Sequence, residues 1–428
     1  MNRPKNLLPA LVFAFAVETL SVTWALKIPG AAPILSVLYC ASGLVIGRLL
    51  TRLPAFKLTA PVLMDAGKHE GPESALWKSP AIHFRLVVAG LLILATWSWC
   101  QYWFDEMPID ITNADMLPII RVMGERFIAG RHGQVYDIIP WIWHGTQPIY
   151  LPAMWLPYVP AIALGIDMRW IAVAGLLFAF TVFLFLYDPP SANSTRSRNY
   201  LSIYLGALAF LLFWWVVADN TPGIVSVAEE GTVIGYYVLL VLALVSGKPW
   251  LTGIAISLCM LSRYALAGWI PAYLLILILG KKWKYVGIVT LTGILCFLLL
   301  FLLPVGWDTF LKLASLPGHY VAFAARVWKD SPDTFSAAPG FAWFFGPRHI
   351  VVLHRLLLTL SFLVPVLFVV VRRGRQSVCN LPLATLKITL VIFYSFIDVP
   401  YLYLFYTSTL VSLIAVTLAL RTPVPVSS

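Results

Sequence analysis

Long apolar stretches separated by short polar connections run along the whole chain. Most of them are close to the length of about 20 residues that an α-helix needs to cross a hydrocarbon core of about 30 Å. The pattern predicts about twelve spans, with approximate bounds 8–26, 31–49, 86–104, 168–187, 200–218, 231–247, 250–262, 265–280, 285–304, 350–371, 383–399 and 401–420. We therefore expect an all-α, polytopic integral membrane protein.

The composition agrees with a protein embedded in the lipid bilayer. Hydrophobic residues make up 60% of the 428 residues and charged residues 11%, with a mean hydropathy of +0.85, whereas roughly a quarter of the residues of a soluble domain carry charge. No long polar block separates the apolar stretches, so a separate soluble domain is excluded. The five cysteines lack metal-ligand spacing, and neither a disulfide framework nor a metal site is expected from them.

The positions of lysine and arginine predict the orientation. The net charge of +11 could suggest a nucleic-acid partner, but the basic residues gather in short connections between spans, which is the positive-inside pattern. With Arg3 and Lys5 inside, the strong basic clusters fall on one side: 48–85, 187–199, 281–284 and 372–375. Both termini are then cytoplasmic, in a plasma (inner) membrane, and no nucleic acid is expected.

This orientation divides the chain into an N-terminal helical hairpin with a cytoplasmic linker, 1–85, and a transmembrane core, 86–428. Two long connections of the core, about 105–167 and 305–349, then lie on the outer face. A short acidic loop on the same face holds Asp219, Glu229 and Glu230. Chemistry is expected on this face.

The first outer loop is expected to have structure of its own. The segment from Asp115 to Ile128 predicts a helix lying on the membrane surface. Its apolar positions are Met116, Ile119, Ile120, Met123 and Phe127. Prolines interrupt the apolar stretch 148–165, and counting it as a span would put Arg196 and Arg198 outside, so we expect a half-buried interfacial hairpin there.

Acidic residues open this loop next to the bilayer. Asp105 and Glu106 lie at the exit of a span, and Asp115 stands at the start of the expected surface helix. Each acid has two interpretations: a charge that complements a helix dipole, or a general base or metal ligand. No metal ligands are assigned, but a divalent cation at the Asp105–Glu106 pair stays open as an alternative.

The remainder of the loop combines aromatic rings with charged groups, which suits a sugar, whose ring faces stack and whose hydroxyls hydrogen-bond. The residues include Arg121, Arg126, Tyr136, Asp137, Trp141, Trp143 and Tyr150. Tryptophan and tyrosine also form belts at membrane interfaces, and for any single tryptophan here the belt is the first interpretation.

The order of residues in this loop resembles that of a known family. The matching segments are Asn113-Ala114-Asp115-Met116, 124–131 (GERFIAGR), Val135-Tyr136-Asp137, Tyr150-Leu151-Pro152 and Trp155-Leu156-Pro157. They resemble the first loop of the GT-C superfamily of membrane glycosyltransferases, most like glycosyltransferase family 87. A second segment, 253–284, is similar to a family segment with one basic residue and a closing basic run, and here Arg263 stands where the family usually has lysine.

The resemblance implies an inverting glycosyltransferase that moves a sugar from a polyprenyl phosphate to an acceptor hydroxyl of a glycan or glycolipid in the cell envelope. Mannose is the first expectation, with arabinose and glucose as alternatives. Such a displacement needs a base for the hydroxyl and positive charge for the leaving phosphate. Asp115 matches the family's aspartate and is expected to be the base, with Asp105 and Glu106 as further candidates.

Substrate contacts are expected from both outer loops and from the segment between two spans. Arg263 is the candidate for the donor phosphate. The others are Arg121, Arg126, Tyr150, His319, Arg326 and Lys329.

A membrane transporter or lipid flippase is the alternative function. Transporters tend to have internal repeats and ionisable residues inside the membrane. The sequence shows no clear repeat, although Glu18 and Lys387 are isolated charges inside expected spans. The uneven distribution of long loops favours the enzyme, and a purely structural subunit would leave the acids of the first loop unexplained.

Overall fold

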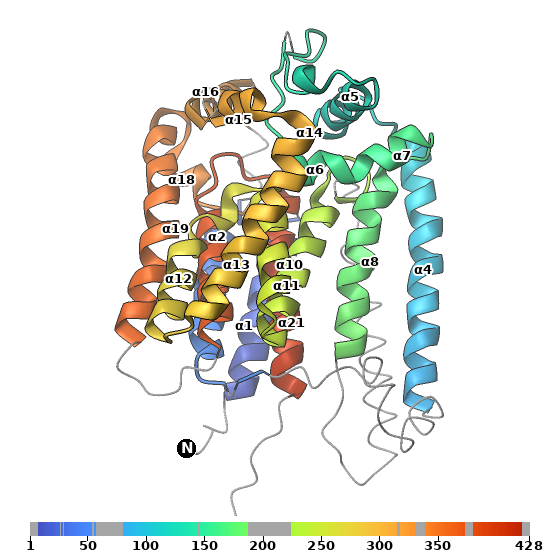
Figure 1. Cartoon of the computed structure of the whole chain (residues 1–428). Helices are drawn as coiled ribbons and strands as arrows, with labels where there is room; N and C mark the ends of the chain where they lie inside the picture. The colour runs from blue at the N-terminus through green and yellow to red at the C-terminus, as the bar shows by residue number, and fades with distance from the viewer. Residues whose placement is uncertain are drawn as a thin grey trace, which may run out of the picture.

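The computed structural model describes residues 7–56 apart from 26, 29 and 54, 80–186 apart from 144, 224–330 apart from 315 and 316, 332, 339–372 and 380–421. This described part is helical and contains no strand, which confirms the all-α prediction for it (Figure 1). The helices of the bundle are α1 (Leu7–Thr23), α2 (Ala32–Leu50), α4 (Pro80–Glu106), α8 (Arg169–Leu186), α10 (Glu230–Ser246), α11 (Pro249–Met260), α12 (Trp269–Leu279), α13 (Trp283–Phe297), α19 (Ile350–Arg372), α20 (Leu381–Ser395) and α21 (Phe405–Arg421).

Helix length and composition identify a multi-pass membrane protein. Six apolar segments of the described part are long enough to cross a membrane: Ala32–Leu50, His83–Glu106, Arg169–Leu186, Trp283–Val305, Pro347–Arg372 and Leu402–Leu420. Five apolar helices of 10–17 residues are shorter: α1, α10, α11, α12 and α20. Each of these segments overlaps an expected span. The expected span 200–218 lies outside the described residues, so the total of about twelve stays a prediction.

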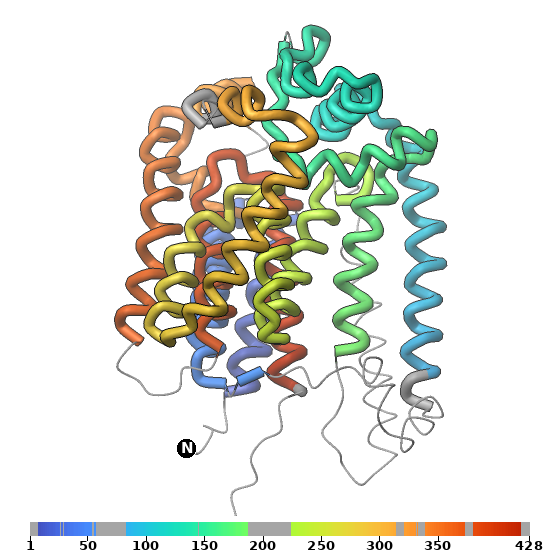
Figure 2. Tube along the Cα trace, viewed as in Figure 1, coloured from blue at the N-terminus to red at the C-terminus, as the bar shows by residue number. Residues whose placement is uncertain are grey.

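The long connections gather at one end of the bundle (Figures 1 and 2). The first contains α5 (Met116–Ile128), η1 (His132–Gln134), α6 (Pro152–Trp155), η2 (Leu156–Tyr158) and α7 (Val159–Ala163). The second follows the π-helical turn η6 (Leu298–Leu302) and contains α14 (Leu303–Val305), α15 (Trp307–Ala314), α16 (Pro317–Asp330), α18 (Ala342–Phe345) and η7 (Pro347–His349). We call this end the loop end. The basic turn between α12 and α13 lies at the opposite end, which we call the basic end.

The surface helix α5 forms where the periodic pattern predicts it. Its buried face comprises Leu117, Ile119, Ile120, Met123 and Gly124. A Cβ atom at Gly124 would lie 2.5 Å from Cδ1 of Ile162, so the glycine permits close contact between α5 and α7. The stretch 148–165 contains three short helical segments, α6, η2 and α7, that follow one another directly across the loop end (Figure 1). No hairpin reversal separates them, and a half-buried position at the membrane interface stays a prediction.

A close contact with α8 fixes the start of α10. A Cβ atom at Gly175 of α8 would lie 2.1 Å from the carbonyl oxygen of Gly231, so the two backbones touch. Small residues allow such contacts between membrane helices. At the other end of α10, Gly247 adopts a φ of +66° and Pro249 begins α11, the usual way to end one helix and start another.

The N-terminal hairpin belongs to the same bundle as the rest of the described chain. Helix α1 packs on α2 and α21, and α2 packs on α20. Their buried residues form one continuous hydrophobic core with those of α10, α20 and α21. The described residues of 7–56 therefore contribute to this core. The expected division at residue 85 stays a prediction, and the linker segment 57–79 lies outside the described residues.

The two ends of the bundle are predicted to face opposite sides of the membrane. In a background with the five native cysteines replaced by alanine, a cysteine at Gly133, on the loop end, is expected to react with an impermeant maleimide added outside intact cells. A cysteine at Arg52 is expected to react only after lysis. Both positions are exposed, and a Cβ atom at Gly133 meets no atom within 4 Å. Labelling of position 52 alone in intact cells would reverse the predicted orientation.

Candidate functional site

Asp115 is held at the loop end as the residue that precedes α5. A helix-capping aspartate normally accepts a hydrogen bond from a backbone N–H of the first turn. Asp115 makes no such side-chain bond, and its backbone is in the right-handed helical region, with φ −89° and ψ −18°. The Asp115 carboxylate therefore does not cap α5.

The surroundings of Asp115 change its acidity. Burial raises the pKa of the Asp115 carboxyl above its ordinary value, and the negative charge of Glu229 acts in the same direction. A hydrogen bond with Trp143 opposes this shift by stabilising the carboxylate. The result is a half-buried carboxylate that is a stronger base than an exposed aspartate.

Three tyrosines lie around this carboxylate. Tyr150, from the first long connection, is within electrostatic range of Asp115 and Glu229, and burial followed by these charges raises its pKa well above the ordinary value. Tyr401 and Tyr403 come from the turn between α20 and α21; their rings stack with centroids 5.6 Å apart. The hydroxyl of Tyr403 contacts Sδ of Met116 at 2.7 Å, next to Asp115 in sequence.

The turn that carries Tyr401 is fixed from two sides. Asp398 pairs through Oδ2 with Nδ1 of His354 in α19 at 2.5 Å, and its carbonyl oxygen accepts a bond from the Trp328 indole of α16 at 3.2 Å. Burial raises the pKa of Tyr401 to about 12, and the charge of Asp115 contributes. These contacts help to hold Tyr401 and Tyr403 near Asp115 and Tyr150, which are far away in the sequence. We call Tyr150, Tyr401 and Tyr403 the aromatic wall.

A buried charge triad lies next to this wall. Arg263, between α11 and α12, binds Oε1 of Glu229 through Nη2 at 2.8 Å and Oε2 of Glu230 through Nη1 at 2.5 Å. The side chains of Glu229 and Glu230 are 1% and 0% exposed, and that of Arg263 is 13% exposed. Glu230 also accepts a hydrogen bond from Thr407 of α21. One guanidinium group thus faces two carboxylates.

The triad changes the expected role of Arg263. Both terminal nitrogens of its guanidinium group face carboxylates, so in this arrangement it does not offer unbalanced positive charge to a phosphate. Oε2 of Glu229 is buried and has no hydrogen-bond partner in the described part of the chain. Glu229 and Glu230 were not among the site residues expected from the sequence. Their sequence signal was a pair of acids at the start of an apolar helix. Acids at that position also complement the helix dipole, so the signal does not by itself indicate a site.

The guanidinium group of Arg126 holds the first long connection together. It donates to the carbonyl oxygens of Gln134, Asp137 and Ile138 at 3.0, 2.6 and 3.2 Å. This network fixes the chain after α5, and a substrate contact of Arg126 stays a prediction. Arg121, on the same helix, is exposed.

The remaining candidates lie at the loop end without joining the cluster around Asp115. Asp105 and Glu106 are exposed at the end of α4, where Asp105 accepts a long bond from Gln101 at 3.4 Å. Among the described residues, no group of three or more histidine, cysteine or acidic side chains forms a cation site. Arg326 and Lys329 are exposed on α16. His319 belongs to the same helix, but its side chain lies outside the described part.

Glu18 and Lys387 form a separate pair in the bundle interior. Both side chains are 0% exposed and bind each other. Lys387 also donates to the carbonyl and hydroxyl oxygens of Ser408, and Ser412 donates to Glu18 at 2.7 Å. The two isolated charges of the expected spans thus lie in the bundle interior, where they neutralise each other.

Comparison with models of known protein families, with curated proteins and with solved structures gives no match. The function is therefore inferred below from the residues of this chain.

Proposed function

We propose that the protein is a membrane-embedded glycosyltransferase that moves a sugar, mannose first, from a polyprenyl phosphate to a hydroxyl of a glycan or glycolipid acceptor. The observation that carries this proposal is the environment of Asp115: a half-buried carboxylate with a raised pKa, not used for capping and surrounded by aromatic rings at the end of a membrane bundle. Aromatic faces and carboxylates together suit a sugar ring and its hydroxyls.

Asp115 acts as the general base in the proposed reaction. It accepts the proton of the acceptor hydroxyl while the hydroxyl oxygen forms a bond to the anomeric carbon of the donor sugar. The bond between that carbon and the phosphate oxygen breaks, and polyprenyl phosphate leaves with the bonding electron pair. Attack from the face opposite the phosphate inverts the configuration. Tyr150, Tyr401 and Tyr403 provide stacking surfaces that hold the sugar.

The leaving phosphate requires positive charge. Arg263 supplies it only if a donor phosphate displaces one of the two glutamates that bind it. Arg326 and Lys329 of α16 are exposed at the same end of the bundle and provide cations without such an exchange. In this proposal the polyprenyl tail stays in the hydrocarbon core and only the phosphate and sugar reach the loop end.

A transporter or flippase is the second candidate, and one observation favours it. Buried ionisable residues occur at two places in the bundle, Glu18 with Lys387 and Arg263 with its two glutamates. Ionisable groups inside membrane helices commonly mark substrate or ion pathways. The two candidates differ in whether a covalent product forms.

Purified protein in proteoliposomes with a radiolabelled polyprenyl phosphate sugar and an acceptor extract is expected to yield a labelled glycan or glycolipid. Asp115 must be ionised to accept a proton, so activity is expected to fall as the pH decreases through its pKa. Because burial raises that pKa, activity should begin to fall at a pH above about 3.9, the pKa of an exposed aspartate. Movement of label across the membrane without a product would support the transporter instead.

A further inference from the structure

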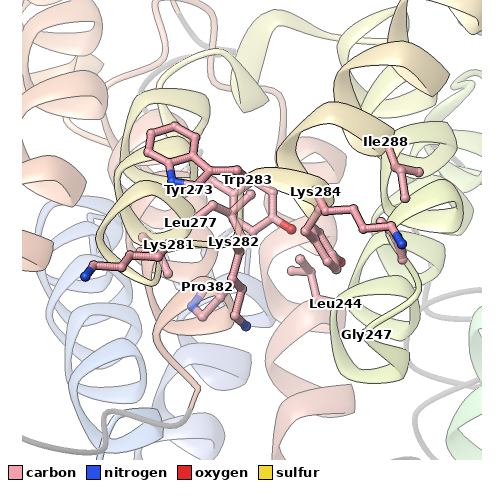
Figure 3. A pocket seen from close by; sticks show the side chains of 13 residues that line it. Leu244, Gly247, Tyr273, Leu277, Lys281, Lys282, Trp283, Lys284, Ile288 and Pro382 are labelled. Carbon is pink, nitrogen blue, oxygen red and sulfur yellow. The ribbon is translucent and has the colours of Figure 1, made fainter.

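A cavity of about 550 Å³ opens at the basic end of the bundle, opposite Asp115 (Figure 3). It lies between the turn that joins α10 to α11 and the turn that joins α12 to α13. Its walls are largely apolar and include Leu244, Ile276, Leu277 and Ile288. None of its residues belongs to the proposed active site.

The mouth of the cavity is positively charged. Lys281, Lys282 and Lys284 are among its lining residues, and Figure 3 shows their side chains extending in different directions. All three side chains are exposed, and the lining contains no aspartate or glutamate. No carboxylate of the described residues forms an ion pair with these lysines. Within the described part of the chain, their charge is therefore without a carboxylate partner, and an anionic ligand can neutralise it.

The backbone at Lys281 supports a role for its side chain. Lys282 N–H bonds to the carbonyl of Leu277 at 3.0 Å and Lys281 N–H to that of Ile278 at 2.9 Å, which is the pattern of a Schellman helix end. The residue at the position of Lys281 normally is glycine, because φ is positive there. Lys281 has a φ of +54°, a conformation that costs a non-glycine residue about 1 kcal/mol or more. Glycine at position 281 would stabilise the fold more than lysine does. The presence of lysine is therefore consistent with a role for its side chain.

The remaining rim places the mouth at the level of lipid headgroups. Trp283 is 62% exposed between the lysines, and exposed tryptophan is enriched at membrane interfaces. Behind it, Tyr285 hydrogen-bonds the buried Thr252 through its hydroxyl at 2.9 Å. Tyr273 stacks on Trp269 with ring centroids 4.4 Å apart. A polar, cationic mouth therefore leads into a largely apolar interior.

We propose that this cavity binds an anionic glycerophospholipid of the surrounding leaflet, with the phosphate at the lysines and the upper part of an acyl chain against the apolar walls. Basic pockets between membrane helices bind such headgroups, and each lysine near the surface contributes about 1 kcal/mol. Lysine suits this ligand because a phosphodiester in a fluid leaflet needs charge more than a fixed bidentate geometry. The apolar interior selects a lipid over free phosphate. This site is independent of the proposed glycosyl transfer.

Native mass spectrometry of the full-length protein in detergent, titrated with phosphatidylglycerol or phosphatidylcholine, tests the assignment. Phosphatidylglycerol is expected to bind more tightly. The double variant Lys281→Gly, Lys282→Gln should lower this preference about tenfold or more. Folding is expected to be retained, because glycine relieves the strained φ at position 281. The matched control Arg48→Gln, Arg52→Gln removes two exposed charges near the end of α2 at the same end of the bundle and should keep the preference.

Four results would overturn the assignment. Equal binding of the two lipids would show that the lysines do not select an anion. An equal loss of preference in both double variants would indicate a general surface charge instead of a site. Displacement of phosphatidylglycerol by equimolar polyprenyl phosphate would assign the cavity to the lipid carrier, and displacement by millimolar inorganic phosphate would assign it to a soluble anion.

Discussion

Replacement of Asp115 by asparagine is expected to lower sugar transfer by about a hundredfold or more, the usual contribution of a positioned general base. Asparagine has nearly the same shape and removes only the capacity to accept the proton. Because the Asp115 side chain does not cap α5, helix formation should be unaffected. Transfer measured in proteoliposomes, together with the unfolding temperature of the variant, separates loss of chemistry from loss of fold.

Asp137→Asn is the matched control for this variant. Asp137 lies in the same connection and its side chain is 48% exposed, 3.6 Å from the ammonium group of the equally exposed Lys312. Surface pairs of this kind contribute about 0–1 kcal/mol, so this variant should transfer sugar normally. Full activity of Asp115→Asn would reject Asp115 as the base and direct attention to Glu229, which lies within its electrostatic range, and then to Asp105 and Glu106.

Replacement of Arg263 by alanine is expected to destabilise the protein by about 3–5 kcal/mol, the usual effect of removing one partner of a buried ion pair. Glu229 and Glu230 would be left buried without their counterion. Lysine at this position should restore part of the loss, since it retains the charge but not the two-pronged geometry. The unfolding transition of the detergent-solubilised protein provides the measurement.

Neutralising both glutamates tests the cause of this effect. If the loss comes from unpaired charge, then adding Glu229→Gln and Glu230→Gln to Arg263→Ala should recover much of the stability. Arg121→Ala, which removes an exposed arginine at the same end, should change the free energy of unfolding by no more than about 0.5 kcal/mol. An Arg263→Ala protein of normal stability with a raised Michaelis constant for the donor would instead support direct binding of the donor phosphate.

The sequence predicted local structure well where the hydrophobic pattern repeats. The surface helix was expected at 115–128 and lies at Met116–Ile128, with Ile119, Ile120 and Met123 on its buried face. The eleven described apolar helices, six long and five short, overlap expected spans. Periodicity is a local property, and burial of one face or of a whole helix is what it encodes.

The sequence could not reveal how the candidate site is assembled. Glu229 and Arg263 are separated by 34 positions in the chain but bind each other, and Tyr403 contacts the residue next to Asp115 from 287 positions away. No hydropathy or charge pattern specifies such pairs. They depend on which helices are neighbours and on close backbone contacts such as that between Gly175 and Gly231.

Arg126 and Lys281 illustrate the same limit for single residues. Both are basic residues in polar connections, and sequence alone suggested a substrate contact for the first and a cytoplasmic position for the second. The fold directs the Arg126 guanidinium to backbone carbonyls, whereas it leaves the Lys281 ammonium at the mouth of a cavity. Charge placement along the chain predicts which side of a membrane a loop occupies, because translocating lysine and arginine is unfavourable. Only tertiary packing determines whether a given charge is neutralised within the protein or left available to a ligand, because that depends on which groups are brought within a few ångströms of it.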